Sequence, residues 1–191
     1  KDLMKSVKDT KKKYAAEKTF LANNTRRNNF LKNLVFSLEG QNNLILFDMI
    51  EKHGKILEEL FEHPDRTLHF VYGGTKGDVR ENLRHIIDGD ENRNHNILAS
   101  YGVFAQGVSI KKIDNIIFAS GYKSEVKVLQ SIGRSLRKIH GDDVLELATL
   151  YDIADDLSSK SFENYSIRHF KRRLELYSKE SFPFKIYKID L

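Results

Sequence analysis

The stretch that decides the fold runs from residue 43 to residue 63 and reads NLILFDMIEKHGKILEELFEH. Its first part, 43–47, is a short apolar run, which is typical of a strand buried on both faces of a sheet. Its second part, 48–63, predicts a helix that has Asp48 as its N-cap and that ends before Pro64. Apolar side chains recur there at helical spacing, at Ile50, Ile56, Leu57, Leu60 and Phe61.

The same alternation of strand and helix continues along the chain. Further strands are predicted at 67–73, 95–100, 114–120 and 144–153. Further helices are predicted at 77–89, 123–138 and 164–179, with a loop or helical turn at 101–110 and a last short strand or tail from 184. Because most strands are apolar runs, the sequence predicts an α/β fold with a mainly parallel sheet covered on both faces.

Two boundaries divide the 191 residues into three parts, which is enough chain for one α/β domain with appended helices. Residues 1–40 are polar and basic, and they predict a helical lead because no Pro or Gly interrupts them before Gly40. The α/β domain is expected at 41–157. The polar segment after it opens a helical extension at 158–191.

Composition excludes several classes of protein. The chain has no cysteine, which rules out disulfides and thiolate metal sites and fits a reducing, cytoplasmic location. No apolar run approaches the roughly 20 residues that cross a bilayer, so no membrane partner is expected. The net charge of +5 permits a phosphate-rich partner and does not require one. The first residue is a lysine, and we expect the chain to be a piece of a longer protein.

In a parallel sheet, ligands bind at the carboxyl ends of the strands, so the loops that follow the strands are the first candidates. The segment YGGTKGD at 72–78 is glycine-rich but lacks the GK[ST] ending of a phosphate loop, and it predicts a tight strand-to-helix turn. Asp152, Asp155 and Asp156 follow another strand, where a capping role is favoured over a metal site. The seven histidines form no zinc motif.

The sharpest pattern is VLQSIGRSLRK at 128–138. On a helix, Gln130, Arg134 and Arg137 fall on one stripe within roughly 60° of one another. Gly133 lies beside that stripe, although glycine in a helix costs about 1 kcal/mol relative to alanine. The pattern is compatible with a solvated basic face. It also suits a polyphosphate site, because Arg supplies fixed donors and Gln orients a water.

Three segments together resemble the motifs of superfamily 2 helicases. Residues 130–138 resemble motif VI, Q-x-x-G-R-x-x-R, residues 97–110 resemble motif V, and residues 43–55 resemble motif IV. They occur in the order that the family shows. Motif V and the segment 116–134 look like those of UvsW-type helicases of tailed phages, which act in recombination and in the rescue of stalled replication forks.

The resemblance implies a RecA-like three-layer domain, the second of two motor domains. ATP with Mg²⁺ would be held mainly by the first domain, and Arg134 and Arg137 would reach its γ-phosphate, with Gln130 near the attacking water. The nucleotide side of the cleft would also include Gly107, Gly133 and Ser109. Many family members have Asp where this chain has Ser109, which rules out a direct contact between Asp and the ribose and argues against nucleotide selectivity through that contact.

The resemblance also implies contacts with nucleic acid. Ser100 and Tyr101 would touch its backbone, and Gly74 and Thr75 would lie on the same track. Lys171 and Arg172 on the C-terminal helix extend that track in one interpretation, and in the other they belong to a solvated amphipathic helix. The expected partners are DNA, single-stranded or branched, and the first RecA-like domain of the same protein. A phage-encoded protein would lie in the host cytoplasm.

Motifs I and II of the family are absent from the 191 residues, so the chain alone is not expected to hydrolyse ATP. One alternative stays open at this point. The Arg stripe suits a passive α/β nucleic-acid-binding module that contacts phosphates of DNA or RNA. A small-molecule α/β enzyme is disfavoured because no nucleophile–base constellation is present.

Overall fold

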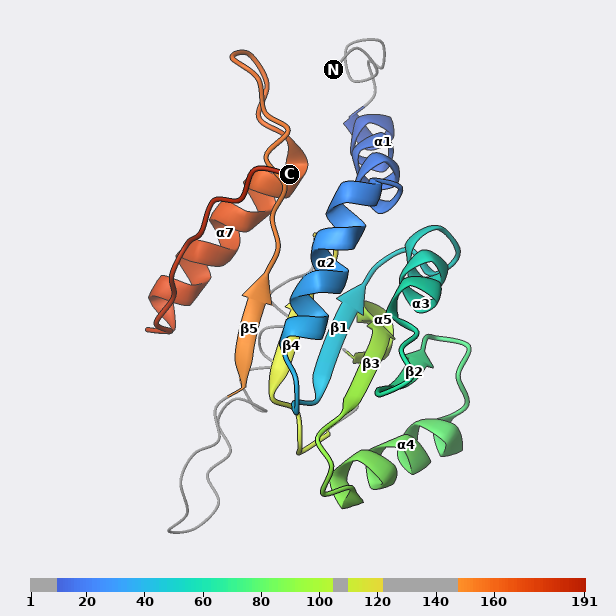
Figure 1. Ribbon diagram of the computed structural model, residues 1–191. Helices are drawn as coiled ribbons and strands as arrows, with labels where there is room; N and C mark the ends of the chain where they lie inside the picture. Colours follow the sequence, from blue (N-terminus) through green and yellow to red (C-terminus); the bar gives the residue numbers. More distant parts are fainter. Residues whose placement is uncertain (1–9, 105–109, 122–147) are drawn as a thin grey trace.

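The computed structural model describes residues 10–104, 110–121 and 148–191 (Figure 1). Five strands form one sheet in the order β2-β3-β1-β4-β5, and all four pairings recorded between them are parallel. The strands are β1 (Asn43–Phe47), β2 (Thr67–Val71), β3 (His95–Ser100), β4 (Asn115–Phe118) and β5 (Thr149–Asp152). The predicted parallel sheet is therefore confirmed.

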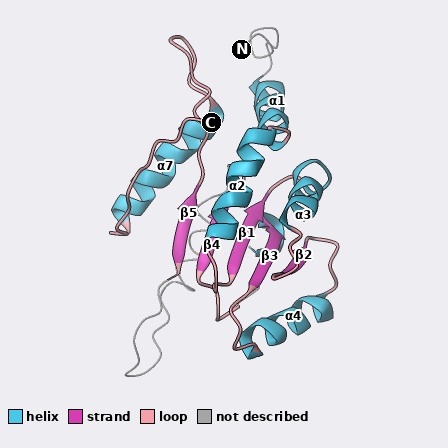
Figure 2. Ribbon diagram, in the orientation of Figure 1, coloured by secondary structure: helices cyan, strands magenta, loops and turns pink. Residues whose placement is uncertain are grey.

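The helices of the described residues lie on both faces of the sheet (Figure 2). They are α1 (Thr10–Ala22), α2 (Thr25–Ser37), α3 (Lys55–Phe61), α4 (Gly77–Gly89), α5 (Tyr101–Phe104) and α7 (Tyr165–Lys179), with a π-helical turn, η1 (Ile50–Gly54), leading into α3. None of these helices is long and apolar enough to cross a membrane.

Two apolar clusters make the fold three-layered. Successive side chains of a strand point to opposite faces, so β1 contributes Leu44 to one cluster and Ile45 to the other. The first cluster is completed by side chains of α4, α5 and α7, and the second by side chains of α2 and α3. The α2 side chains Leu31 and Val35 are fully buried there, so the predicted helical lead contributes to the core. The division at residues 40 and 157 stays a prediction.

The predicted helix at 48–63 differs at its start. Asp48 is not an N-cap, because its carboxylate pairs with Lys18 of α1 and its backbone N–H donates to the Ser120 hydroxyl at 3.0 Å. The chain instead makes the wide turn η1 before α3 begins. Gly54 closes that turn against Phe47, since a Cβ at Gly54 would lie 2.5 Å from the Phe47 ring.

The remaining predicted elements agree closely. Helix 77–89 matches α4 and strand 95–100 matches β3 at both ends. Strand 114–120 is shorter than predicted, and the described tail from 184 contains no strand. Predicted helix 123–138 and the first residues of predicted strand 144–153 lie outside the described residues.

Candidate functional site

The carboxyl ends of the five parallel strands share one edge of the sheet, and α1 lies beyond that edge (Figure 1). Several predicted site residues follow the strands there. Gly74 and Thr75 come after β2, Ser100 is the last residue of β3, and Tyr101 begins α5. The fold thus brings these four predicted nucleic-acid contacts to a single edge, whereas Lys171 and Arg172 lie on α7.

The turn after β2 is tight and exposed. The Thr75 hydroxyl accepts a hydrogen bond from the Tyr72 backbone N–H at 3.0 Å, and the Thr75 N–H donates to the Tyr72 carbonyl at 2.8 Å. A Cβ at Gly74 would lie 2.7 Å from the ring of the exposed Tyr72, so a larger residue there would require that ring to move. The predicted strand-to-helix turn is confirmed, and α4 starts directly after it, at Gly77.

Ser100 and Tyr101 are both buried at the end of β3. The Tyr101 hydroxyl donates to the Ser120 carbonyl at 2.6 Å, and its ring packs edge-on against Phe118. The Tyr101 side chain therefore ties the end of β3 to the end of β4. Its predicted contact with nucleic acid stays a prediction.

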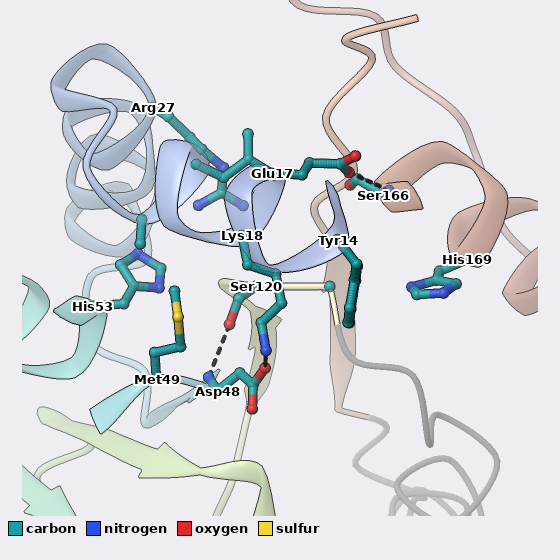
Figure 3. Close-up of a pocket in the computed structure, with 13 residues that line it drawn as sticks. Tyr14, Glu17, Lys18, Arg27, Asp48, Met49, His53, Ser120, Ser166 and His169 are labelled. Carbon is teal, nitrogen blue, oxygen red and sulfur yellow. Dashed lines mark hydrogen bonds and ion pairs between the residues drawn. The ribbon is translucent and has the colours of Figure 1, made fainter. Parts of the chain in front are cut away.

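A small cavity of about 20 Å³ lies under α1 at the carboxyl ends of β1 and β4 (Figure 3). Lys18 of α1 pairs with Asp48 at one side of it, and Ser120 and Met49 belong to its wall. Figure 3 shows Tyr14 of α1 on the side that faces His169 of α7. A volume of this size holds about one water molecule and cannot hold a nucleotide.

Arg27 and His53 give this cavity its polar character, and both are about 1% exposed. The Arg27 Nε donates to Asp155 at 2.7 Å, while both terminal nitrogens of Arg27 and Nδ1 of His53 lack a hydrogen-bond partner among the described atoms. Burial, and secondarily the Arg27 charge, lowers the pKa of His53 to about 3. The imidazole is therefore neutral at physiological pH.

A carboxylate from α1 caps the N-terminus of α7. The Glu17 side chain, 3% exposed, accepts hydrogen bonds from the backbone N–H groups of Tyr165 at 2.9 Å and Ser166 at 2.7 Å, and from the Asn164 side chain at 3.0 Å. A negative charge is favourable at that end of a helix. The sequence gives no signal of this contact, because the partners are about 148 positions apart.

The three carboxylates after β5 have separate partners. Asp152 accepts from Arg173 at 2.6 Å and from the Tyr177 hydroxyl at 2.8 Å, whereas Asp155 pairs with Arg27. Asp156 accepts from Ser158, and these hydrogen bonds lower the pKa of Asp156. The described residues contain no group of three His, Asp or Glu side chains placed to bind a metal.

The two basic residues predicted on the C-terminal helix differ in their surroundings. Lys171 pairs with Glu163 on the surface. Arg172 lines a groove between α1 and α7. The other predicted site residues lie outside the described part of the chain, and their roles stay predictions: Gln130, Gly133, Arg134, Arg137, Gly107 and Ser109.

Comparison with known proteins gives a family and two relatives. The model of the helicase conserved C-terminal domain matches residues 26–138, which is more than half of the chain. The ATP-dependent DNA helicase UvsW of Enterobacteria phage T4 is 28% identical over 94% of the chain, and the putative ATP-dependent helicase IRC3 of Saccharomyces cerevisiae is 31% identical over 52% of it. The chain spans 37% of the first relative and 14% of the second.

Solved structures agree with these relatives. The crystal structure of T4 UvsW matches 94% of this chain, and 36% of its own, with a TM-score of 0.69. The C-terminal domain of the DEAD-box protein Dbp5 matches 83% of this chain and 82% of its own, with a TM-score of 0.58 at 13% identity, which supports the fold alone. The predicted RecA-like fold and the resemblance to superfamily 2 helicases are both confirmed.

Proposed function

The chain belongs to the helicase conserved C-terminal domain family, and from this premise we propose that it is the C-terminal motor half of an ATP-dependent DNA helicase. One observation carries the proposal. The family match over residues 26–138 includes all three motif-like segments, at 43–55, 97–110 and 130–138. The DNA helicase of phage T4, similar along 94% of the chain, favours DNA as the substrate.

The proposed nucleotide contacts come from the motif V and motif VI segments. Arg134 and Arg137 contact the γ-phosphate of ATP that is held, with Mg²⁺, mainly by the first motor domain, and Gln130 lies near the attacking water. Gly107, Ser109 and Gly133 form the rest of this half of the site. Arginines suit this role because they are always charged and bind phosphate oxygens with two parallel hydrogen bonds.

The proposed DNA contacts lie at the carboxyl edge of the sheet. Gly74, Thr75, Ser100 and Tyr101 contribute there, and contacts of this kind to phosphates hold DNA without regard to its sequence. Movement of one motor domain relative to the other along a strand would then remodel forks or branched recombination intermediates. The protein acts in the cytoplasm, in the host if a phage encodes it.

In this proposal the chain alone does not hydrolyse ATP, because the residues needed for hydrolysis are divided between two motor domains. It carries no motif I or motif II, so ATP hydrolysis requires the first RecA-like domain of the same protein. Residues 41–157 form the motor domain in this proposal. Residues 1–40 lead into it, and residues 158–191 extend it.

The test is an Arg137→Ala variant of the protein that includes the first motor domain. We expect ATP turnover to fall by about 10³-fold or more, because an arginine finger contributes about 10³–10⁵ in phosphoryl transfer. DNA affinity should change little, and Lys138→Ala serves as the matched control. Normal turnover by Arg137→Ala would contradict the proposal. A loss of DNA affinity with a flatter salt dependence in Arg134→Ala and Arg137→Ala would instead indicate a passive binding module.

A further inference from the structure

A groove of about 230 Å³ runs between the N-terminal parts of α1 and α7. Its basic side chains are Lys11 from α1 and Arg168 and Arg172 from α7, and two rings, Tyr14 and Tyr165, form part of its wall. The two helices lie far apart in the sequence and contact each other at the first turn of α7. The groove therefore exists only in the folded protein.

The walls of this groove are held in place by contacts between α1 and α7. The rings of Tyr14 and Tyr165 lie 5.2 Å apart, and the Tyr165 hydroxyl donates to the Thr10 carbonyl at 3.1 Å. The Glu17 cap fixes the first turn of α7 against α1. A ligand thus meets a surface that is already formed, which lowers the entropic cost of binding.

The charge of the groove is of one sign. None of the described residues that line it is acidic. The carboxylate of α1, Glu17, is buried and bonded to the N-terminus of α7, and Glu163 is paired with Lys171. Arg168 lies over the Tyr165 ring at 4.2 Å, which orders its guanidinium group. Such a groove attracts an anion, and guanidinium groups match phosphate geometry.

The position of the groove indicates which anion it binds. Tyr14 and His169 line both this groove and the cavity at the carboxyl ends of β1 and β4. The groove therefore adjoins the carboxyl edge of the sheet on the side of β1 and β4, and the DNA contacts of the motor domain are proposed along the same edge. A single strand that extends from that edge past α1 and along the first turns of α7 would meet Arg168 and Arg172.

We propose that the groove between α1 and α7 binds the phosphodiester backbone of single-stranded DNA, as a second contact site outside the sheet edge. This proposal depends on the proposed helicase function only for the choice of DNA as the ligand. Arg168 and Arg172 each contact a phosphate, and Lys171, which is paired with Glu163, does not.

The experiment is a titration of a fluorescein-labelled oligothymidine with this chain at several salt concentrations, followed by fluorescence anisotropy. We compare Arg168→Gln/Arg172→Gln with Lys179→Gln/Lys185→Gln, which removes the same charge from exposed residues outside the groove. Each lost contact with a single strand lowers the slope of log affinity against log salt by about 0.7. The groove variant should therefore lower the slope by about 1.4, and the control pair by much less.

Equal changes in the two double variants, or none in either, would overturn the proposal, as would a wild-type chain that does not bind the oligonucleotide. Loss of binding to phosphatidylserine vesicles in the groove variant, with DNA binding unchanged, would assign the groove to a membrane surface instead. Tighter binding of inorganic tripolyphosphate than of oligothymidine would assign it to a free polyphosphate. The turnover of Arg137→Ala tests the motor function separately, so failure of one proposal leaves the other measurable.

Discussion

Buried His53 couples the stability of the protein to pH. Its imidazole lies beside the Arg27 guanidinium, and burial with that charge lowers its pKa to about 3 in the folded state, against about 6.5 in an unfolded chain. Between these values the unfolded state binds a proton that the folded state does not. Stability contributed by His53 is therefore complete above pH 6.5 and is lost as the pH falls below it.

We expect the free energy of unfolding to fall by about 1.4 kcal/mol per pH unit from His53 alone between pH 6.5 and pH 4. Urea denaturation at several pH values measures this dependence. A His53→Gln variant should show a shallower decline. Some decline should remain, because burial and the neighbouring His95 also lower the pKa of His69, to about 4. An identical pH profile in the two proteins would contradict the assignment.

The role of a residue could be predicted from the sequence where its contacts are with residues close to it in the chain. The turn at Gly74 follows from glycine spacing between a strand and a helix, and the structure confirms it. The N-cap at Asp48 was wrong because Lys18, from a helix 30 residues earlier, takes its carboxylate. The pair Arg27–Asp155 joins positions 128 apart, and no local pattern marks either partner.

The π-helical turn η1 depends on the absence of a side chain at Gly54. A Cβ there would lie 2.5 Å from the ring of Phe47, which is fully buried and stacked on Phe70. We expect Gly54→Ala to destabilise the protein by about 1–3 kcal/mol, the usual cost of overpacking a core. Gly89→Ala at the end of α4 is the control, since nothing lies within 4 Å of its Cβ position. Equal midpoints of thermal unfolding in Gly54→Ala and Gly89→Ala would contradict the dependence of η1 on Gly54.

The N-terminus of α7 depends on the Glu17 carboxylate. Glu17→Gln would replace one acceptor oxygen by an amide that faces backbone N–H groups, so a buried donor loses its partner. We expect a loss of about 1–3 kcal/mol in the free energy of unfolding. Glu175→Gln changes an exposed carboxylate of α7 and should leave the free energy of unfolding almost unchanged. Chemical denaturation measures the stability of both variants. Equal losses in Glu17→Gln and Glu175→Gln would indicate a general effect of charge and would contradict the capping role of Glu17.

The bounds of strands and helices could be predicted where the apolar runs and the helical spacing of the sequence coincide with burial in the structure. β1 and β3 are buried at every position, and α4 has a clear apolar stripe, so their bounds agree with the predictions. The tail from 184 has strand-like spacing, but Ile186, Tyr187 and Ile189 stay exposed and pair with no strand among the described residues. The spacing of apolar residues indicates which segments suit a strand. It does not indicate whether another strand lies beside the segment to pair with it.

At the scale of the whole molecule, α1 is joined to the first turn of α7, whose later turns pack on the sheet. Deletion of residues 1–23 removes α1 and leaves the first amides of α7 without the Glu17 cap. We expect hydrogen exchange of the amides at 165 and 166 to accelerate by more than tenfold, while β1 keeps its protection, because its neighbours β3 and β4 remain. Deletion of 184–191, an exposed tail, is the control and should leave both regions unchanged.

The three-layer arrangement could be predicted because strand–helix alternation restricts a parallel sheet to a few topologies. The two apolar clusters then follow from burial on both faces. The packing of α1 on α7 could not be predicted, since their contacts join the two ends of the described chain. The groove between these helices was missed for the same reason.

The Glu17 cap has a consequence for synthesis on the ribosome. The carboxylate is synthesised about 148 residues before the helix that it caps, so it has no amide of α7 to bind until then. α7 gains its cap only after its own first turn has left the exit tunnel. The docking of α7 onto α1 therefore requires the synthesis of residue 166, and a chain that stops before residue 165 leaves the Glu17 carboxylate without the amides that it caps.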